Sequence, residues 1–187
     1  MSAQDPLEAL IELLSLDDIP RMGWIQRGVT PPESVAGHIV GVSHLALALV
    51  PRIQPELDLG RVLAMAVLHD APEARTGDLP RRASIHLPPG AKRTMEDGAA
   101  GELLEGLGET ALDAWNELRA AETREARFVK VCDALQLGVR LLGYVRTGRR
   151  GLGEFRSGLE ELDASEFPPA EALRVAILAG LDAEGGA

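Results

Sequence analysis

The stretch that decides the fold is LAMAVLHDAPEARTGDLPRR, residues 63–82. Its apolar helical run stops abruptly at His69-Asp70, and a proline follows at position 72. Pro72 has no N–H to bond the Leu68 carbonyl and its ring crowds that carbonyl, so we expect the helix to end near His69-Asp70. Burying both polar side chains without partners costs several kcal/mol, whereas the negative end of a helix favours a cation. The stretch therefore suggests a bound metal ion.

The composition of the chain favours one helical globular domain over residues 1–187. Hydrophobic residues make up 45% of the 187 residues and the mean hydropathy is +0.01, which is typical of a globular chain. Aromatic residues make up only 3%, and strands favour aromatic and β-branched residues. We therefore expect an all-α fold, with helices over 6–14, 33–50, 57–69, 91–107, 109–120, 123–147, 152–162 and 169–181. The segments 15–32 and 75–90, rich in proline and glycine, are expected to be loops.

The charge and the cysteine count exclude several classes of function. The formal net charge is −10 and the sequence pI is about 4.9, so nucleic acid is not an expected partner. A metal ion and a few arginines can still reverse the sign locally and admit a small phosphate. The lone Cys132 fits a reducing cytoplasm. The acidic start is no signal peptide, and the longest apolar run, HLALALV, is far short of the ~20 residues that span a membrane.

Four ionisable residues on apolar helices form a candidate metal site: His38, His69, Asp70 and Asp133. Asp133 lies midway along the longest predicted helix among apolar neighbours, where a charged Asp is expensive unless it is paired or binds a metal. Two imidazoles and two carboxylates suit a divalent cation such as Mn, Fe, Co, Zn or Mg. With coordination positions left for water, such a set supports metal-assisted hydrolysis.

A simpler interpretation exists for each of these residues. A lone histidine in a helix is usually a satisfied core residue, and we assign His44 and His86 to that class. Asp133 is able to pair with Lys130, three positions earlier on the same helix. The metal hypothesis is favoured because His, His-Asp and Asp recur on three successive long helices that are able to pack together.

The order His38, His69-Asp70, Asp133 resembles the H…HD…D signature of HD-domain metal-dependent phosphohydrolases. Three segments extend the likeness to the 5′-deoxynucleotidase branch of that family: RMGWIQRGVTPPESVAGH, LHDAPEARTGDLP and EARFVKVCDALQLG. The resemblance covers about residues 7–165, and a closing helix is expected at about 168–182. It implies an all-α HD-domain helical bundle, a homodimer, and removal of phosphate from 2′-deoxynucleoside 5′-monophosphates.

The resemblance also assigns roles to individual residues. The four candidate ligands would hold one divalent metal, and Glu73 would orient or deprotonate the attacking water. Asp78 would face the sugar or the leaving oxygen, and in some relatives carboxylates at the positions of Glu73 and Asp78 hold a second ion. Arg21 would grip the phosphate, with Arg81 assisting; Arg27 and Arg82 are further candidates, although solvated surface charge is the preferred interpretation of Arg82. Trp24 would either stack on the base or pin its loop to the core.

Two departures from the family pattern stand out. Met22-Gly23 separates Arg21 from Trp24, where bacterial relatives place Trp directly after Arg. Gly37 stands before His38, where relatives usually have an acidic residue. The absence of that carboxylate, which would support the metal ligand, is expected to soften metal affinity.

Other functions on the same scaffold remain open. A guanosine tetraphosphate hydrolase usually carries an acidic pair after the His-Asp, whereas Glu73 is followed here by Ala74. A two-metal cyclic-nucleotide phosphodiesterase needs more His ligands than the chain offers. A non-catalytic nucleotide-binding HD module is the alternative outside enzymes, and loss of Glu73 or of a ligand would have suggested it.

Overall fold

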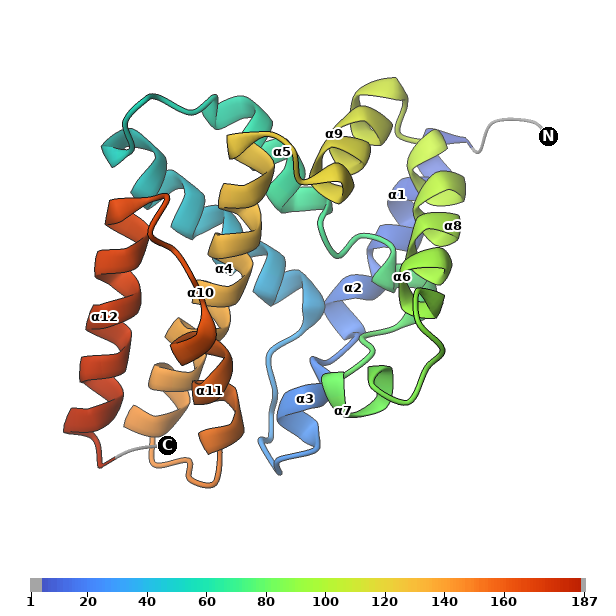
Figure 1. The fold of residues 1–187 in the computed structure, drawn as a ribbon. Helices are drawn as coiled ribbons and strands as arrows, with labels where there is room; N and C mark the ends of the chain where they lie inside the picture. The colour runs from blue at the N-terminus through green and yellow to red at the C-terminus, as the bar shows by residue number, and fades with distance from the viewer. Residues whose placement is uncertain (1–4, 186–187) are drawn as a thin grey trace.

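All regular secondary structure in residues 5–185, the part of the chain that the computed structural model describes, is helical (Figure 1). Over this range the only bridge between extended segments is an isolated one that pairs Pro20 with Ser34. The all-α prediction is therefore confirmed. The elements are α1 (Pro6–Leu13), α2 (Ser15–Asp18), α3 (Met22–Ile25), α4 (Val35–Leu49), the 3₁₀ turn η1 (Val50–Arg52), α5 (Leu59–Leu68), α6 (Glu73–Thr76), α7 (Arg81–Ser84), α8 (Ala91–Glu105), α9 (Glu109–Ala120), α10 (Arg124–Arg146), α11 (Gly153–Glu161) and α12 (Pro168–Ala183).

The long helices begin and end close to the predicted residues because local capping fixes their ends. Side-chain oxygens of Asp5, Ser34, Asp58 and Thr123 accept backbone N–H groups in the first turns of α1, α4, α5 and α10. The helix α5 ends at Leu68, with His69 as its C-cap, as Pro72 predicted. Because α4 begins only at Val35, Glu33 lies outside the helix that was predicted to contain it.

The prediction of loops over 15–32 and 75–90 is partly wrong, because each segment contains single helical turns. The segment 15–32 contains α2 and α3, and the segment 75–90 contains α7 and the end of α6. These turns are too short to show a helical pattern in the sequence, and their boundaries are set by contacts. The carboxylate of Asp78, for instance, accepts the N–H of Met22 at the start of α3.

Three helices form the centre of the bundle, and the candidate site lies where they meet. The helices α4, α5 and α10 pack on one another, with α11 and α12 on one side and α8 and α9 on the other (Figure 1). The main core is apolar and fully buried, as Val42, Met65 and Phe128 illustrate on the three central helices. A second cluster, built around Leu103, Leu104 and Trp115, joins α8 and α9 to the end of α5. The central helices therefore set the backbone positions of the predicted ligands.

One helical stretch, Val35–Arg52, is long and apolar enough to cross a membrane by length and composition, with a mean hydropathy of 1.3 over 18 residues. The sequence shows no uninterrupted apolar run of that length, because polar residues such as His38 lie within this stretch. In this structure 39% of the stretch is buried. A core helix of a soluble protein meets the same criteria, and α4 packs here against α5 and α10.

Candidate metal centre and phosphate site

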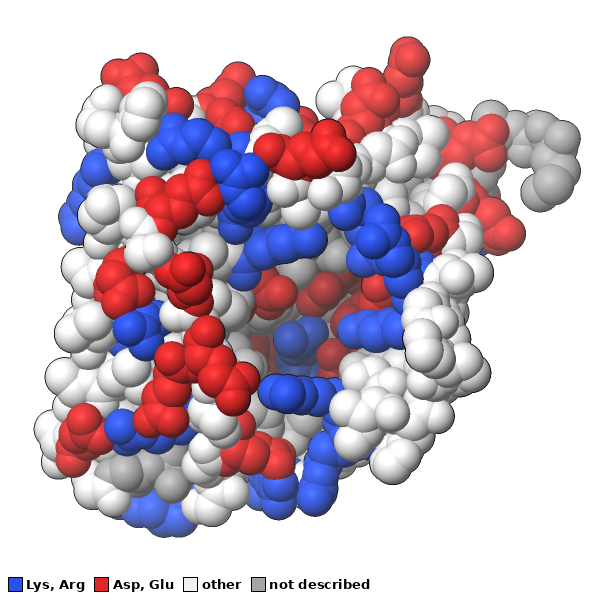
Figure 2. Space-filling view, viewed as in Figure 1, with Lys and Arg blue, Asp and Glu red and all other residues white. Residues whose placement is uncertain are grey.

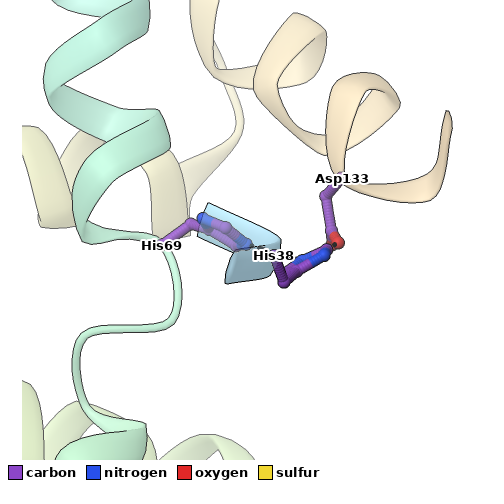
Figure 3. Close-up of side chains that lie close together, drawn as sticks. All are labelled: His38, His69 and Asp133. Atoms are coloured by element: carbon purple, nitrogen blue, oxygen red, sulfur yellow. Dashed lines mark hydrogen bonds and ion pairs between the residues drawn. The ribbon is translucent and has the colours of Figure 1, made fainter. Parts of the chain in front are cut away.

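Side chains from three helices converge on one point, as Figure 3 shows for His38, His69 and Asp133. One potential ligand atom from each of the three lies within 4.8 Å of the others. The His38 Nε2 atom is 3.0 Å from Asp133 Oδ1 and 3.1 Å from His69 Nε2. Because these residues come from α4, the end of α5 and α10, the central packing of the bundle itself assembles the group.

The fourth predicted ligand, Asp70, lies against the same two imidazoles. Its Oδ2 atom is 3.6 Å from His38 Nε2 and 3.3 Å from His69 Nε2. The same oxygen also accepts a hydrogen bond from Arg21 Nη1 at 3.0 Å. The structure therefore brings all four predicted ligands together and ties one of them to the predicted phosphate-binding arginine.

The hydrogen bonds of the two imidazoles suit a cation between them. His69 Nδ1 lies 2.7 Å from the carbonyl of Ala66, and His38 Nδ1 lies 2.6 Å from Gln136 Oε1. Both partners are acceptors, so both Nδ1 atoms carry the proton and both Nε2 lone pairs face each other. Two lone pairs at 3.1 Å repel unless a proton or a cation lies between them. The donor set and its orientation thus fit a divalent metal ion with two nitrogen and two oxygen ligands.

The electrostatics of the group favour positive charge at its centre. Burial disfavours the charged form of His69, but Asp70 and Asp133 outweigh it and raise the His69 pKa to about 9. Burial also opposes ionisation of Asp70 and Asp133, yet the neighbouring histidines hold the pKa of both carboxyls below its usual range. These charges therefore favour positive charge, from a proton or from a metal ion, between the imidazoles.

Asp133 differs from expectation in its exposure. Its side chain is 47% exposed because it faces the open cleft rather than the apolar core around it. The alternative partner, Lys130, is an exposed residue, and within residues 5–185 no ion pair joins it to Asp133. The contact of Asp133 with His38 favours the metal interpretation over the simple i−3 pair.

A second cluster of charges lies beside the candidate metal centre. Arg21 Nη1 contacts Asp70 at 3.0 Å, Asp78 at 3.1 Å and Glu73 at 3.9 Å. Asp78 also accepts the N–H of Met22 at 2.5 Å, which fixes the start of α3 against the loop after α6. Arg21 is thus placed for phosphate, but it is engaged by carboxylates in this structure.

Glu73 has the least exposed carboxylate of this cluster. Its side chain is only 7% exposed, and within residues 5–185 its Oε2 atom has no hydrogen-bond partner. Burial, together with the charges of Asp70 and Asp78, raises the Glu73 pKa to about 9 despite the nearby Arg21. A buried carboxyl with a raised pKa beside a candidate metal centre has the properties of a group that exchanges protons during a reaction.

These charges lie at the bottom of a cavity of about 720 Å³. Figure 2 shows the hollow, with acidic side chains in its depth and basic side chains around its mouth. Basic residues on its wall include Arg81, Arg82 and Lys92. Arg82 lies on the wall of the cavity but is an exposed residue, which agrees with its interpretation as solvated surface charge. Arg27 forms a short ion pair with Glu154, another residue of this wall.

The contacts of Trp24 distinguish its two predicted roles, stacking on the base and pinning its loop to the core. Its ring is 1% exposed, lies 4.0 Å from Phe155 between centroids, and meets Tyr144 edge-on at 5.1 Å. No face of the indole is free for a base, so its contacts favour the pin over the stacking platform. The histidines that were assigned to the core are also placed differently, because His44 and His86 are both exposed.

Sequence reasoning missed two buried polar residues behind His38. Gln136 is 4% exposed and Glu33 is 5% exposed, and Gln136 contacts both His38 and Glu33. A weak signal existed, since Gln136 follows Asp133 by three positions and so lies on the same face of α10. Its contact with His38 joins positions 98 residues apart, which no local pattern reveals.

Comparison with known proteins gives a consistent result. The sequence profile of the HD domain family matches residues 14–165. A protein of Schizosaccharomyces pombe named 5′-deoxynucleotidase hdd1 is 28% identical over 153 residues, which cover 76% of this chain and 75% of that protein. The mouse (Mus musculus) protein named 5′-deoxynucleotidase HDDC2 is 30% identical over 126 residues, which cover 65% of this chain and 61% of that protein. The crystal structure of the PH0347 protein from Pyrococcus horikoshii superposes with a TM-score of 0.82 at 26% identity, covering 93% of this chain and 99% of that one.

Proposed function

Because the chain belongs to the HD domain family, we propose that it is a metal-dependent phosphohydrolase that removes the 5′-phosphate of 2′-deoxynucleoside 5′-monophosphates. The observation that carries the proposal is the meeting of two imidazole nitrogens and two carboxylates beside a cavity that also holds Arg21, Glu73 and Asp78. The relatives named above as 5′-deoxynucleotidases support the choice of substrate.

Different residues of the cavity have different roles in the proposed hydrolysis of the phosphate ester. When bound to His38, His69, Asp70 and Asp133, a divalent cation supplies a nucleophile at neutral pH and counter-charge for the phosphate. The guanidinium of Arg21 neutralises and orients the phosphate dianion, for which its forked geometry is suited.

Glu73 accepts the proton of the attacking water, for which its carboxyl has to be ionised. Its pKa of about 9 depends on burial and on the charges of Asp70 and Asp78. Neutralising Asp70 by ligation removes one of those charges, so Glu73 ionises more readily in the loaded enzyme. Asp78 holds Arg21 and the start of α3, and it lies where it can approach the sugar or the leaving oxygen.

A phosphate-release assay tests this proposal. Protein stripped with EDTA is assayed with deoxy- and ribonucleoside 5′-monophosphates and guanosine tetraphosphate, alone and after addition of Mn²⁺, Co²⁺, Mg²⁺, Zn²⁺ or Fe²⁺. We expect metal-dependent release from the deoxynucleotides. Added pyrophosphatase converts the pyrophosphate that hydrolysis of guanosine tetraphosphate would release into phosphate. Release from guanosine tetraphosphate but from none of the monophosphates would favour the other hydrolase class, and metal-dependent nucleotide binding without turnover would favour a non-catalytic module.

A matched pair of variants separates the metal site from the rest of α4. His38→Ala removes a proposed ligand, whereas His44→Ala removes an exposed imidazole from the same helix. We expect only the first to lose bound metal and activity. Equal metal content in the two variants would contradict the ligand assignment.

We also propose a homodimer. The family resemblance implies it, and exposed apolar side chains on and just after α1 support it. The apolar segment AILAGL near the C-terminus offers no surface for a partner at Ile177 and Leu181, because both are buried within the chain. A row of large apolar side chains is instead exposed on and just after α1: Leu7, Leu10, Ile11 and Leu14 are 51–71% exposed. Sedimentation of a monomer at micromolar concentration would contradict the dimer.

We propose a cytoplasmic setting, with a second copy of the chain as partner and with neither nucleic acid nor a membrane bound. The net charge of −10 disfavours nucleic acid, and the single Cys132 is buried as a free thiol. A small nucleotide is then the natural substrate for a cavity of this size and charge.

A further inference from the structure

A chain of polar side chains runs behind His38, away from the cavity. His38 Nδ1 lies 2.6 Å from Gln136 Oε1, and Gln136 Nε2 donates to Glu33 Oε1 at 2.6 Å. Arg140 donates to the same Glu33 oxygen from Nε at 2.8 Å, and its Nη2 atom forms an ion pair with that oxygen at 2.7 Å. The chain thus begins at a permanent cation near the surface and ends at a candidate metal ligand.

The cation at one end fixes the direction of every hydrogen bond in this chain. A guanidinium has donors only, so the Glu33 oxygen has to accept. The amide group of Gln136 that faces Glu33 is then the NH₂ group, and its oxygen faces His38. That oxygen accepts the proton of His38 Nδ1, which leaves Nε2 with a lone pair directed at Asp133 and His69.

His69 reaches the same state by a different route. Its Nδ1 proton is held by the backbone carbonyl of Ala66, one turn earlier on α5. A backbone carbonyl cannot be changed by substitution, and it accepts in every variant. The orientation of His38 depends instead on the side chains of Gln136 and Glu33, so it is open to test.

We propose that Glu33 and Gln136 are positioning residues that hold His38 as the Nδ1–H tautomer and thereby set the affinity of the site for its cation. The inference rests on the proposed function insofar as it takes His38 to be a ligand. The backbone carbonyl of Glu33 accepts the N–H of Arg21 at 2.8 Å, and every Glu33 variant keeps that contact. The Glu33 carboxylate does not line the cavity and reaches His38 through Gln136, so substitutions of this side chain act on His38 through Gln136.

The surrounding structure is shaped to keep the amide of Gln136 in place. A Cβ atom at Gly41 would lie 2.7 Å from Gln136 Nε2 and 2.8 Å from its Cγ, so only glycine leaves room for this side chain on α4. Tyr144 Oη accepts the backbone N–H of Glu33 at 2.9 Å, a nearby contact that involves neither the Gln136 amide nor the Glu33 carboxylate.

The energetics indicate a function beyond stability for this chain. Glu33 is 1% exposed at its side chain, and its Oε2 atom has no hydrogen-bond partner. Apolar residues of similar volume often replace buried charged groups at no loss of stability. An apolar residue at either position would fill the same space but would not orient the metal ligand His38.

Titration of metal-free protein with Co²⁺, followed by its visible absorption, tests the proposal without substrate. Supporting groups of this kind typically change metal affinity by about 10–100-fold. We expect Gln136→Leu and Glu33→Met each to weaken Co²⁺ binding within that range, with an altered absorption band. Glu33→Gln keeps an acceptor for Arg140 and Gln136, so it should bind Co²⁺ nearly as the wild type does.

Tyr144→Phe is the matched control, because it removes a hydrogen bond from the same region and leaves the Glu33 carboxylate in place. We expect it to keep wild-type Co²⁺ affinity. Wild-type affinity in Gln136→Leu and Glu33→Met, or equal losses in Glu33→Met and Glu33→Gln, would overturn the proposal.

Two other results are also decisive. Should Gln136→Leu fail to fold, the contrast between Glu33→Met and Glu33→Gln carries the test, since both leave Gln136 in place. Absence of Co²⁺ binding by the wild-type protein would overturn the metal site itself and the inference with it. Binding by the wild type with no effect of the variants would overturn the inference alone.

Discussion

Replacement of Glu73 by glutamine is expected to make the metal-free protein more stable and the enzyme less active. The Glu73 side chain is 7% exposed, and burial with the charges of Asp70 and Asp78 raises its pKa from 4.5 to about 9. At neutral pH the folded protein therefore holds a proton on Glu73 that the unfolded chain has released. Glutamine has a similar shape and carries no charge, so it removes the need for that proton.

The size of the effect follows from the two pKa values. Between an unfolded pKa of 4.5 and pH 7, proton uptake by Glu73 costs about 3 kcal/mol, at about 1.4 kcal/mol for each pH unit. The buried amide needs partners of its own, which offsets about 1 kcal/mol. We therefore expect Glu73→Gln to raise the free energy of unfolding by about 2 kcal/mol at pH 7.

The sign of the pH dependence is fixed by the direction of the shift. Because the folded pKa is raised above the unfolded one, the stability contributed by Glu73 is complete below pH 4.5 and declines as the pH rises toward 9. The advantage of Glu73→Gln should thus be small at pH 5 and should grow by about 1.4 kcal/mol per pH unit up to pH 8.

Urea unfolding of EDTA-treated protein at pH 5, 7 and 8 measures this difference. Glu122→Gln, which changes an exposed carboxylate between α9 and α10, is the control and should show no such trend. An unchanged or lower stability of Glu73→Gln at pH 8 would refute the electrostatic reasoning, as would a gain that does not depend on pH.

The same variant tests the catalytic role of Glu73. Loss of general-base assistance typically lowers kcat by about 10²–10⁴-fold. We expect Glu73→Gln to keep its metal and its affinity for substrate while kcat falls within that range. A variant that purifies without metal would instead identify Glu73 as a ligand and overturn the four-ligand assignment.

Three further predictions concern the cavity and its support. Arg21→Ala should lower kcat/KM for phosphorylated substrates by about 10²-fold, because a charge-assisted contact to the phosphate is lost; steady-state kinetics with unchanged values would contradict this. Since the pKa of His69 is raised to about 9 and ligation needs its neutral form, Co²⁺ affinity should rise about tenfold per pH unit between pH 6 and 8; a flat profile in isothermal titration would exclude a competing proton. Gly41→Ala should displace Gln136 and weaken both folding and Co²⁺ binding, whereas Gly143→Ala, with open space around it on α10, should stabilise the helix by about 1 kcal/mol and leave the metal site unchanged.

The central helices could be predicted because the signals that set them are local. Pro72 ends α5 through a carbonyl four residues earlier, and Thr123 begins α10 through an N–H three residues later. His69 is therefore placed at a helix end by the sequence alone. Its encounter with His38 and Asp133 required only that three strongly apolar helices pack together.

The short turns could not be predicted, because their stability comes from partners distant in the sequence. The turn α3 is held by Asp78, a residue 56 positions away from Met22, and by the packing of Trp24 on Phe155. The degree of exposure of Asp133 escaped prediction for the same reason. Apolar neighbours in the sequence say nothing about a cavity that opens on one side of the helix.

The prediction of a softer metal site was made from a single position. It rested on Gly37, which stands where relatives usually place an acidic residue before the ligand His38. In the structure the carboxylate of Glu33 is linked to the back of His38 through Gln136, which lies 103 residues after Glu33. To bind a metal through Nε2, His38 needs a hydrogen-bond acceptor of fixed orientation at its Nδ1 atom. The carboxylate that fixes this acceptor can come from any position in the sequence. The softer site therefore stays a prediction, and it has to be weighed against the support that Glu33 and Gln136 together are proposed to give His38.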